Sequence, residues 1–409
     1  MNKFLKEFKE KGFFYQCTSE DELSSLLNKK KIKAYIGFDC TAESLHVGSL
    51  LQIMCLRLLQ KHGHQPIVLL GGGTTRIGDP SGKDKTRKIL SEVEINKNSK
   101  NIEKILKNYL NTTDKNVKPI FVNNYSWLKN LNYISFLRNI GKHFTINKML
   151  TFDSVKTRLD REQSLSYMEF NYMILQAYDF LELNEKYECV LQIGGSDQWG
   201  NIVNGVDLIK RHLSKQSYGL TTPLITLATG AKMGKTESGA IWLDSKFLSP
   251  YEYWQFWRNI DDRDVIKFLN FFTDLAAHEI EKIKNEEINQ LKILLANKTT
   301  EMLHGKNEAK KSEDAAKEAF SENSTGSNLP TVKLESKLLN KKMNIVDLII
   351  HSKLENSKSE IRRLIKGNAI KINNKSIVDE KFLISNDLFQ NNFLKLSIGK
   401  KRHLKIELN

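Results

Sequence analysis

Two short segments far apart in the sequence carry side chains that could bind phosphate. His46 lies in "GFDCTAESLHVGSLL", where an apolar strand gives way to a helix that Ser44 is placed to cap. His46 would then lie in the first turn, where free N–H groups and the helix dipole attract a phosphate, and Gly48 would let a flat base pack on the helix backbone. Lys232 and Lys235 lie in "TGAKMGKTESGAIWL", a loop rich in Gly, Ser and Thr. Each segment alone is more typical of an exposed surface than of a site.

A third segment, "GGGTTRIGDPSGK", is glycine-rich but matches neither common nucleotide-binding motif. A Walker A loop would need glycine at Ile77 and Ser or Thr at Asp84, and a dinucleotide-binding fingerprint would need glycine at Arg76. The segment therefore predicts a turn-rich loop that carries one carboxylate, Asp79, among basic residues.

The elements that must position these residues alternate between strands and helices. "KAYIGFD" and "PIVLLGGG" predict strands, "LLQIMCLRLLQKHGH" the helix between them, and "YECVLQIGGSD" a later strand. Strands that alternate with helices and end in glycine are typical of a parallel α/β sheet, whose ligands lie at the carboxyl ends of the strands. We therefore expect the chemistry near residues 37–39, 71–82 and 194–198.

At 409 residues, the chain is long enough for two or three domains. We expect a Rossmann-like catalytic domain with a parallel sheet over residues 1–246. A mostly α-helical domain is expected over 247–320, where glycines become rare and stretches such as "YEYWQFWRNI" have a helical pattern. The composition of "SENSTGSNLPT" indicates a linker, assigned to 321–336, and a small α+β domain is expected over 337–409.

The distribution of charge favours a polyanionic partner. The formal net charge is +15, and residues 331–409 alone contain 17 Lys and Arg against 8 Asp and Glu. A face that only needs to be solvated would not require such clustering, so the C-terminal part is expected to bind nucleic acid.

Cysteine spacing and hydropathy exclude several other classes of protein. The four cysteines form no C-x-x-C pair, which argues against a zinc site and against a disulfide framework and favours a reducing cytoplasm. The sequence has no apolar run of about 18 residues and no secretory signal, so no membrane association is expected.

Taken together, the two phosphate-binding segments resemble the signatures of class I aminoacyl-tRNA synthetases. "HVGS" resembles the His-Ile-Gly-His motif of that class, and "KMGKT" resembles Lys-Met-Ser-Lys-Ser. "YIGFDCTAESLHVGSL", "GGGTTRIGDPSGK", "YMILQAYDF" and "QIGGSDQWGNI" resemble segments of the bacterial-type tyrosyl-tRNA synthetase family, in that family's order and spacing. The C-terminal domain looks like a small RNA-binding module that is shared with a ribosomal protein.

The resemblance implies a two-step reaction. The carboxylate of tyrosine would attack the α-phosphorus of ATP, and the tyrosyl group of the adenylate would then pass to the 3′ end of tRNA(Tyr). Mg²⁺ would arrive with ATP, because the sequence shows no carboxylate cluster dedicated to a metal. The family also implies a homodimer.

The matching motifs imply roles for individual residues around the phosphates. Thr41 and His46 would hydrogen-bond the departing pyrophosphate, and basic residues on two loops would close over the same phosphates. The catalytic residues implied are Thr41, His46, Ser49, Lys83, Arg87, Lys232 and Lys235.

The resemblance also implies separate sites for tyrosine and for the nucleotide. Tyr35 and Asp179 would bind the phenolic hydroxyl, so that a site left with unpaired polar groups rejects phenylalanine, an effect for which this family is itself the established example. Asp79, Tyr172 and Gln176 would hold the ammonium group, and Gln198 would lie near the amino acid and the adenylate. The ATP-binding residues implied are Gly37, Asp39, His46, Gly48, Gly195, Asp197 and Lys235.

Two positions depart from the family's pattern. Ser49 stands where a second histidine is usual; its hydroxyl still donates a hydrogen bond but is shorter and carries no charge. Cys40 stands where proline is common, which puts the stiffness of this loop in doubt.

Two alternative functions remain open from the sequence alone. A synthetase relative that mainly binds structured RNA would have lost substrate residues, whereas Tyr35, Asp79, Gln176 and Asp179 are all present. The other alternative is a tryptophanyl-type synthetase or another nucleotidyltransferase with a His-x-Gly-His element. The pairing of Tyr35 with Asp179 and the basic C-terminal domain argue against it.

Overall fold

The computed structural model describes residues 2–81, 89–230, 233–236, 239–320, 329, 331–339, 343–390, 392–399 and 402–409, without the side chains of residues 235, 236, 319 and 320. The chain forms two compact units. The first contains Met1–Asp244 and Asp261–Leu291, and the second contains Ser245–Ile260 and Lys292–Asn409. Among the described residues, no helix combines the length and the apolar character that crossing a bilayer requires.

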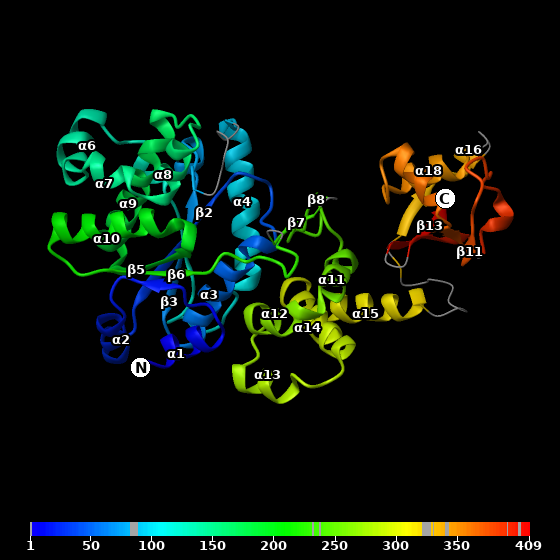
Figure 1. Ribbon diagram of the computed structural model, residues 1–409, viewed down its shortest axis with the longest axis horizontal. Helices are drawn as coiled ribbons and strands as arrows, with labels where there is room; N and C mark the ends of the chain where they lie inside the picture. Colours follow the sequence, from blue (N-terminus) through cyan, green and yellow to red (C-terminus); the bar gives the residue numbers. More distant parts are fainter. Residues whose placement is uncertain are drawn as a thin grey trace. The chain divides into compact units, whose positions relative to one another are not determined.

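The first unit is built on a six-stranded sheet with the order β1-β6-β5-β2-β3-β4. Figure 1 labels four of these strands, β2, β3, β5 and β6. All neighbouring strands are parallel except β1, which pairs antiparallel with β6 at the edge. The interior strands β2 and β3 are mostly buried along their length, as expected for parallel strands covered on both faces. The parallel α/β sheet expected from the sequence is confirmed. The strands are β1 (Gln16–Cys17), β2 (Lys33–Asp39), β3 (Gln65–Gly71), β4 (Ile120–Asn123), β5 (Cys189–Gly195) and β6 (Tyr218–Thr222).

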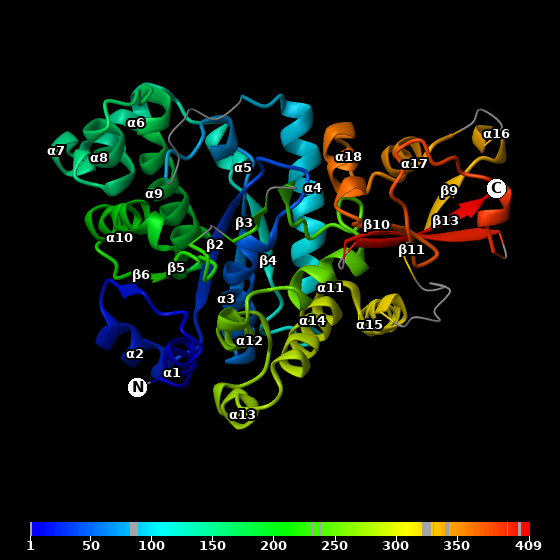
Figure 2. The same ribbon diagram turned by 45° about the vertical axis from the view of Figure 1, so that its right-hand side comes forward.

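Strands are added to this sheet in opposite directions on either side of the neighbouring pair β2 and β5. From β2 the chain passes through α3 (Leu50–Lys61) to β3 on one side, and from β5 it passes through α10 (Trp199–Leu213) to β6 on the other. Right-handed crossovers in opposite directions place these helices on opposite faces of the sheet, as Figure 2 shows. A crevice opens at such a switch point beyond the carboxyl ends of the strands, which is where ligands bind in this architecture.

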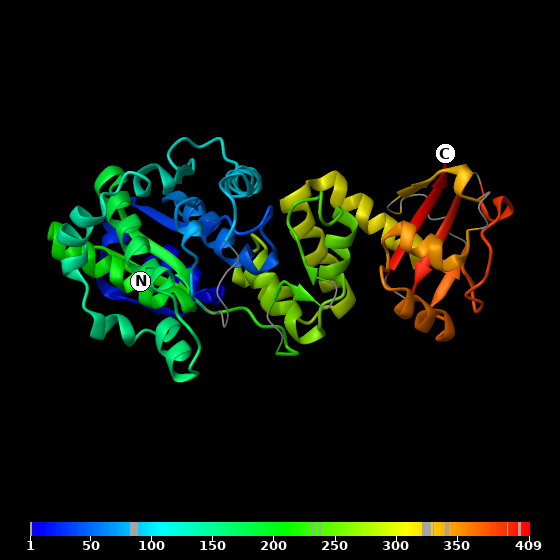
Figure 3. The same ribbon diagram turned by 90° about the horizontal axis from the view of Figure 1, so that it is seen from above.

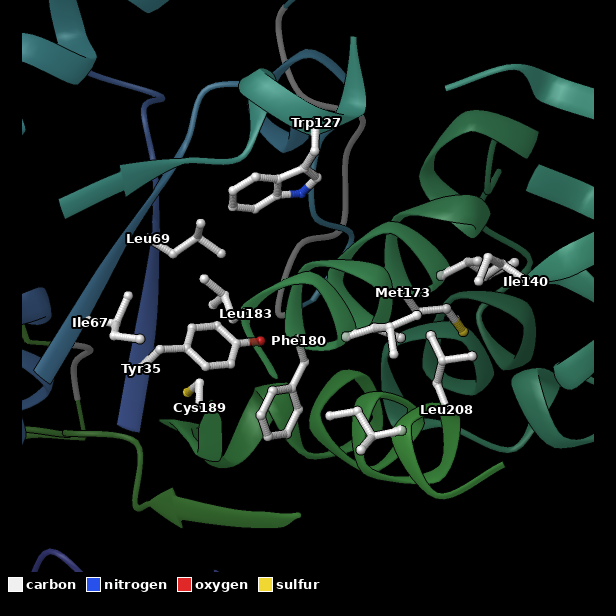
Figure 4. Packing of buried hydrophobic residues seen from close by; sticks show 14 of the residues in the cluster. Tyr35, Ile67, Leu69, Trp127, Ile140, Met173, Phe180, Leu183, Cys189 and Leu208 are labelled. Carbon is white, nitrogen blue, oxygen red and sulfur yellow. The ribbon is translucent and has the colours of Figure 1, made fainter. Parts of the chain in front are cut away.

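The long helix α9 (Tyr167–Tyr187) packs against α10 and β5 and carries several expected site residues. A capping box fixes its start, since Ser166 Oγ accepts from Glu169 N and the Glu169 side chain accepts from Ser166 N. Below the site, a hydrophobic cluster joins this helix to the sheet, and Figure 4 shows Tyr35 and Phe180 at its centre, with ring centroids 5.2 Å apart.

Shorter elements complete the first unit. They include the antiparallel pair formed by β7 and β8 and the turns η1 to η4. The remaining elements of this unit are α1 (Lys3–Glu10), α2 (Glu20–Lys29), η1 (Val47–Ser49), η2 (Thr74–Arg76), α4 (Glu92–Tyr109), α5 (Tyr125–Leu128), α6 (Tyr133–Asn139), η3 (Gly141–His143), α7 (Ile146–Leu150), α8 (Asp153–Asp160), η4 (Ser196–Gln198), β7 (Lys235–Thr236), β8 (Gly239–Ala240), η5 (Asp262–Asp264), α12 (Val265–Phe272) and α13 (Ala277–Ile283).

The second unit combines helices with a separate five-stranded sheet of order β11-β10-β12-β13-β9. Helices α17 and α18 lie on one face of this sheet, over a core of its own (Figure 2, Figure 3). Its helices are α11 (Pro250–Arg258), α15 (Lys306–Phe320), α16 (Ser336–Leu339), α17 (Ile345–Ser352) and α18 (Lys358–Lys366), and α14 (Ile288–His304) spans the boundary between the units. Its strands are β9 (Thr331–Leu334), β10 (Ile370–Ile372), β11 (Lys375–Ser376), β12 (Phe393–Ile398) and β13 (Arg402–Leu408), with the turn η6 (Asn386–Leu388).

Two expected domain boundaries do not coincide with these elements. Residues 261–291 belong to the first compact unit, although the sequence pattern assigned 247–320 to one helical domain. The segment 321–336, expected to be a linker, includes β9, whose residues pair in parallel with β13 from Thr331 to Leu334. The C-terminal sheet therefore begins inside the expected linker.

Candidate active site

A cavity of about 390 Å³ lies at the carboxyl ends of the central strands of the first unit. Every expected site residue whose side chain the structure describes lines it. Lys83, Arg87 and Lys232 fall outside the described residues, and of Lys235 only the backbone in β7 is described. The expected residues in the lining are Tyr35, Gly37, Asp39, Thr41, His46, Gly48, Ser49, Asp79, Tyr172, Gln176, Asp179, Gly195, Asp197 and Gln198.

Asp179 is a buried carboxylate held by two hydrogen-bond donors. Trp127 Nε1 donates to its Oδ1 and Asn124 Nδ2 to its Oδ2, both at 2.8 Å. Burial raises the pKa of Asp179 to about 8, while the hydrogen bonds from Asn124 and Trp127 act in the opposite direction. Each oxygen keeps a lone pair, so this carboxylate can accept a further hydrogen bond from a ligand.

Tyr35 brings a hydroxyl into the same end of the cavity. Its side chain is only 1% exposed, and among the residues that the structure describes its hydroxyl has no hydrogen-bond partner. Burial raises the pKa of Tyr35 well above its usual range, and the charge of Asp179 adds to this effect, so the hydroxyl stays a donor. Gln192 on β5 is the register partner of Tyr35, and its buried Oε1 likewise has no partner within the described part of the chain. A phenol could satisfy both Tyr35 and Asp179.

Asp39, at the end of β2, is the second carboxylate in the centre of the site. Its Oδ1 accepts from Thr74 Oγ1 at 2.8 Å, and its Oδ2 accepts from Tyr172 Oη at 3.1 Å. Burial raises the pKa of Tyr172 well above its usual range, and the charge of Asp39 adds to the shift, so this tyrosine remains protonated.

Asp79 and three amide side chains form a further polar cluster. Gln198 Nε2 donates to Asp79 Oδ2 at 2.8 Å, and Asn201 Nδ2 lies 3.0 Å from Gln176 Oε1 and 3.1 Å from Gln198 Oε1. Asp79 also accepts from the backbone N–H of Ser81. Carboxylate and amide oxygens in one cluster provide acceptors for an ammonium group.

The segment around His46 differs in detail from the expectation. Ser44 does not cap the helix; its Oγ donates to Leu45 O and accepts from Asp244 N. Instead His46 itself is the N-cap of the turn η1, which leads into α3, and its Nδ1 accepts from Gly48 N at 2.9 Å. An accepting Nδ1 places the hydrogen of the neutral ring on Nε2, which can donate to a ligand.

The loop that carries the downstream lysines lies directly against this turn. Val47 N donates to Ile241 O at 2.9 Å, and His46 forms an isolated bridge with Trp242. A Cβ at Gly48 would lie 2.7 Å from His46 Nδ1 and 3.1 Å from Met233 O, so glycine is required here by the protein's own contacts. Met233, Ile241 and Trp242, which flank the lysines in the sequence, therefore lie beside the turn that carries His46 and Gly48.

The two departures from the family's pattern are accommodated locally. Ser49 ends η1 and makes no capping hydrogen bond through its side chain to α3, although it lines the cavity. Cys40 is fully buried, its N–H donates to Thr75 Oγ1 at 2.7 Å, and its carbonyl accepts from Asn98 Nδ2 at 2.9 Å. Backbone hydrogen bonds thus fix the loop where proline is common.

Sequence reasoning missed several side chains that hold the expected residues in place. Thr74, Asn124 and Trp127 contact the two central carboxylates, and Gln192 and Asn201 line or support the cavity wall. One signal was available: "FVNN" places polar residues at the end of a strand, and parallel strands that neighbour one another end at the same edge of the sheet.

Comparisons with known proteins agree with this geometry. A family model described as "tRNA synthetases class I (W and Y)" matches residues 27–321, so the fold and the site define a class I aminoacyl-tRNA synthetase. A second model, "Tyrosine--tRNA ligase SYY-like C-terminal domain", matches residues 321–406. Within the class, the chain belongs to the Tyrosine--tRNA ligase family.

Relatives with that name span the full length of the chain. "Tyrosine--tRNA ligase" of Pelagibacter ubique (strain HTCC1062) is 76% identical over 408 residues, which is 100% of both chains. The protein of the same name from Wolbachia sp. subsp. Brugia malayi (strain TRS) is 53% identical and covers 99% of this chain and 98% of its own. A C-terminally truncated mitochondrial tyrosyl-tRNA synthetase of Aspergillus nidulans has 31% identity and a TM-score of 0.69, over 78% of this chain and 94% of that one.

Proposed function

We propose that this chain activates tyrosine with ATP and transfers the tyrosyl group to tRNA(Tyr), as a tyrosine--tRNA ligase. In the first step an oxygen of the tyrosine carboxylate forms a bond to the α-phosphorus of ATP, and the bond from that phosphorus to pyrophosphate breaks. In the second step the hydroxyl of the terminal adenosine of the tRNA attacks the tyrosyl carbonyl, and AMP leaves. Neither step needs a covalent intermediate with the enzyme, so the residues act by positioning and by donating hydrogen bonds.

The observation that carries the proposal is the pairing of Tyr35 with Asp179. Asp179 retains acceptor capacity beside its two donors, and the hydroxyl of Tyr35 is an unpaired buried donor. A phenol donates to the first and accepts from the second, whereas the phenyl ring of phenylalanine would leave both buried groups unsatisfied.

At the opposite end of tyrosine, the polar cluster would hold the ammonium group. Asp79 supplies a negative charge, Gln176 an amide oxygen, and Tyr172 a hydroxyl oxygen whose hydrogen is directed to Asp39. The carboxylate of tyrosine would then point toward the nucleotide, with Gln198 between the amino acid and the adenylate.

The nucleotide would occupy the part of the cavity between β2, β5 and the turn η1. Asp197 and the backbone of Gly195 would contact the ribose, and Gly37, Asp39 and Gly48 would line the rest of the adenylate site. Thr41 and the Nε2 of His46 would donate to the phosphates in the transition state. Ser49, Lys83, Arg87, Lys232 and Lys235 are proposed as further donors to the phosphates.

Mg²⁺ would be bound mainly by the phosphates of ATP. Among the described residues there is no group of three or more His, Cys, Asp or Glu side chains that could hold a metal ion, so the proposal gives the metal no protein site of its own. Its contribution, when bound, is to neutralise charge on the phosphates.

The C-terminal sheet domain is proposed to bind the tRNA. Its helix α18 exposes Lys358, Arg362, Arg363 and Lys366. Two of these also form ion pairs, Arg362 with Glu380 and Arg363 with Glu360. A row of exposed cations on one helix matches the phosphate backbone of RNA, and its contribution to binding should weaken with added salt.

A homodimer is proposed from exposed apolar side chains in the segment between β4 and the start of α9. Tyr133 and Tyr167 are 56% and 67% exposed, and their hydroxyls are 2.8 Å apart. An apolar patch of this kind is typical of an interface, and a second copy of the chain is the occupant that the family implies. We define this dimer patch as Tyr133, Ile134, Leu137, Ile146, Leu150, Leu159 and Tyr167.

ATP–pyrophosphate exchange tests the proposed activation step. We expect fast exchange with tyrosine, much slower but measurable exchange with phenylalanine, and background exchange with tryptophan. Exchange driven by tryptophan would establish the tryptophanyl alternative. A properly folded preparation that shows no exchange with tyrosine, but binds structured RNA, would replace the proposal by the RNA-binding alternative.

A further inference from the structure

A chain of hydrogen bonds joins the two central carboxylates of the site through residues that no substrate role requires. Thr74 Oγ1 donates to Asp39 Oδ1 at 2.8 Å and accepts from Asn124 Nδ2 at 3.0 Å. The same Asn124 amide group donates to Asp179 Oδ2 at 2.8 Å. The path therefore runs from Asp39 through Thr74 and Asn124 to Asp179.

Both linking side chains are buried and have little freedom to move. Thr74 is 3% exposed and Asn124 is fully buried. Asn124 Oδ1 accepts from Gly73 N at 2.7 Å, so both ends of this amide are fixed, and its nitrogen must face Thr74 and Asp179. The Thr74 hydroxyl has one hydrogen, and because Asn124 donates to it, that hydrogen is directed to Asp39.

The glycine-rich loop after β3 is shaped around this link. A Cβ at Gly71 would collide with Asp39 Oδ1 and would lie 2.6 Å from Thr74 Oγ1. A Cβ at Gly73 would lie 3.2 Å from Asn124 Oδ1. The loop that matched no phosphate-binding motif thus makes room for the contacts of Thr74 and Asn124.

We propose that Thr74 is a positioning residue that sets both carboxylates at once, and so couples recognition of the phenol at Asp179 to the amino-acid and nucleotide end at Asp39. The proposal rests on the proposed function, because it assigns tyrosine to this cavity. Thr74 is part of the cavity lining, and in this role it acts through Asn124 on one side and through Asp39 on the other.

The two arms of this link have different consequences for different substrates. Asp39 lies at the end of the site that tyrosine and phenylalanine share, so misplacing it slows activation of both. Asp179 contacts only the phenolic hydroxyl, so misplacing it slows the activation of tyrosine alone. Loss of the Thr74 hydroxyl should therefore lower the rates with both amino acids and also lower the preference for tyrosine over phenylalanine.

The test uses the full-length chain and measures kcat/KM for exchange with tyrosine and with phenylalanine. Thr74→Val removes the hydroxyl and keeps the shape of the side chain. Thr74→Ala removes both the hydroxyl and the methyl group, and Thr74→Ser retains the hydroxyl. Thr221→Val is the matched control, because Thr221 is a fully buried threonine outside the cavity lining whose Oγ1 donates to Gln16 O.

We expect Thr74→Val and Thr74→Ala to lower the tyrosine-to-phenylalanine ratio by about tenfold or more, the size of effect typical of a hydrogen bond that orients a charged group. Thr74→Ser should stay within about threefold of the wild type, and Thr221→Val should leave the ratio unchanged. A partly unfolded sample lowers both rates and leaves the ratio alone, so folding defects do not mimic the result.

If Thr74→Val and Thr74→Ala both left the tyrosine-to-phenylalanine ratio of kcat/KM unchanged, the proposal would be overturned. This holds whether the values for the two amino acids fall equally or do not fall. Failure of Thr74→Ser to retain the ratio would also overturn it, since the hydroxyl would not be the group that matters. Wild-type exchange with tyrosine is measured separately, so failure of the proposed function would be recognised before any variant is compared.

Discussion

At the scale of single residues, the proposed recognition of the phenol depends on the ionisation of Asp179. Burial favours the protonated acid, and the two donors favour the carboxylate that can accept from a phenol. The donor residues therefore tune the pH range in which the site selects tyrosine, although neither needs to touch the substrate.

Replacing Trp127 by phenylalanine tests this balance. The hydrogen bond from Trp127 lowers the pKa of Asp179, so its loss should raise that pKa further above the usual range. Because the ionised form accepts the phenol, kcat/KM for tyrosine falls as pH drops through this pKa, and in the variant the fall should begin about half to one pH unit higher. The measurement is the pH profile of pyrophosphate exchange.

The control for this variant is Trp254→Phe, which removes a similar indole donor in the second unit, where Trp254 Nε1 donates to Asn297 Oδ1 at 2.7 Å. Its pH profile should match that of the wild type. A Trp127→Phe profile that does not move, or that moves to lower pH, would contradict the assigned role of this donor.

The site residues that could be predicted from the sequence are those that lie in a recognisable local motif or at a regular spacing on one helix. His46 and Gly48 stand in a short motif at a strand–helix junction, and Tyr172 and Asp179 lie on one helix seven residues apart, where the structure places both in the cavity wall. Thr74 and Trp127 have no such pattern, and Asn124 shows only a pair of polar residues at the end of a strand. Their role depends on which strand ends lie side by side, and the sequence does not state the strand order.

At the scale of secondary structure elements, long and strongly patterned segments were predictable and two-residue strands were not. The expected strands at 33–39 and near 66–73 form β2 and β3, and the helix between them forms α3. The strands β1, β7 and β8 contain two residues each, too few to show an alternating pattern.

The helices that follow α11 pack against the first compact unit, although the sequence pattern grouped them with the helical segment 247–320. Lys11 Nζ donates to the carbonyl oxygens of Thr273 and Leu275 at 3.0 and 2.7 Å, and Arg57 binds Asp274. These contacts attach the end of α12 to α1 and α3 within the first unit. A helical pattern in the sequence shows that a segment forms a helix, but it does not show which neighbour the helix packs against.

The dimer patch gives a prediction at this scale. Figure 1 and Figure 2 both show α6, α7 and α8, which carry most of the patch, grouped at one end of the first unit. Ile134 is 70% exposed, so Ile134→Asp should leave the fold of one chain intact while it places a charge in the interface. We expect the dissociation constant of the dimer to rise by about a hundredfold, as measured by analytical ultracentrifugation over a range of protein concentrations.

Val93→Asp provides the comparison, because Val93 is 78% exposed on α4 and outside the patch. This variant should sediment as the wild type does. A wild-type chain that is monomeric at all concentrations would refute the dimer. If Ile134→Asp dimerised with unchanged affinity, the interface would not include the dimer patch.

At the scale of the whole molecule, the separate core of the C-terminal sheet predicts that activation and tRNA charging can be separated. The buried residues of this core come from 334 to 406, and β9 is one of its strands. A chain that ends at residue 330 removes the whole sheet, whereas a cut at the expected boundary after 336 would leave β9 without its partner β13.

The chain that ends at residue 330 should retain tyrosine-dependent pyrophosphate exchange within about threefold and lose most of its charging of tRNA(Tyr), because phosphate contacts supply a large share of RNA affinity. Aminoacylation and exchange are measured on the same preparations. Full charging by the shortened chain would refute the proposed RNA-binding role, and equal loss of both activities would show that the sheet supports the catalytic unit.

The pairing of β1 with β6 determines when the edge of the first sheet can be completed during synthesis. Gln16 pairs with Thr221, and Cys17 with Leu220, so β1 waits during synthesis for a partner made about two hundred residues later. Until β6 is made, the edge of β5 is open and β1 is unpaired, and open edges of apolar strands are prone to join other chains. The nascent chain is therefore most exposed to aggregation after residue 195 has emerged and before residue 222 has followed it.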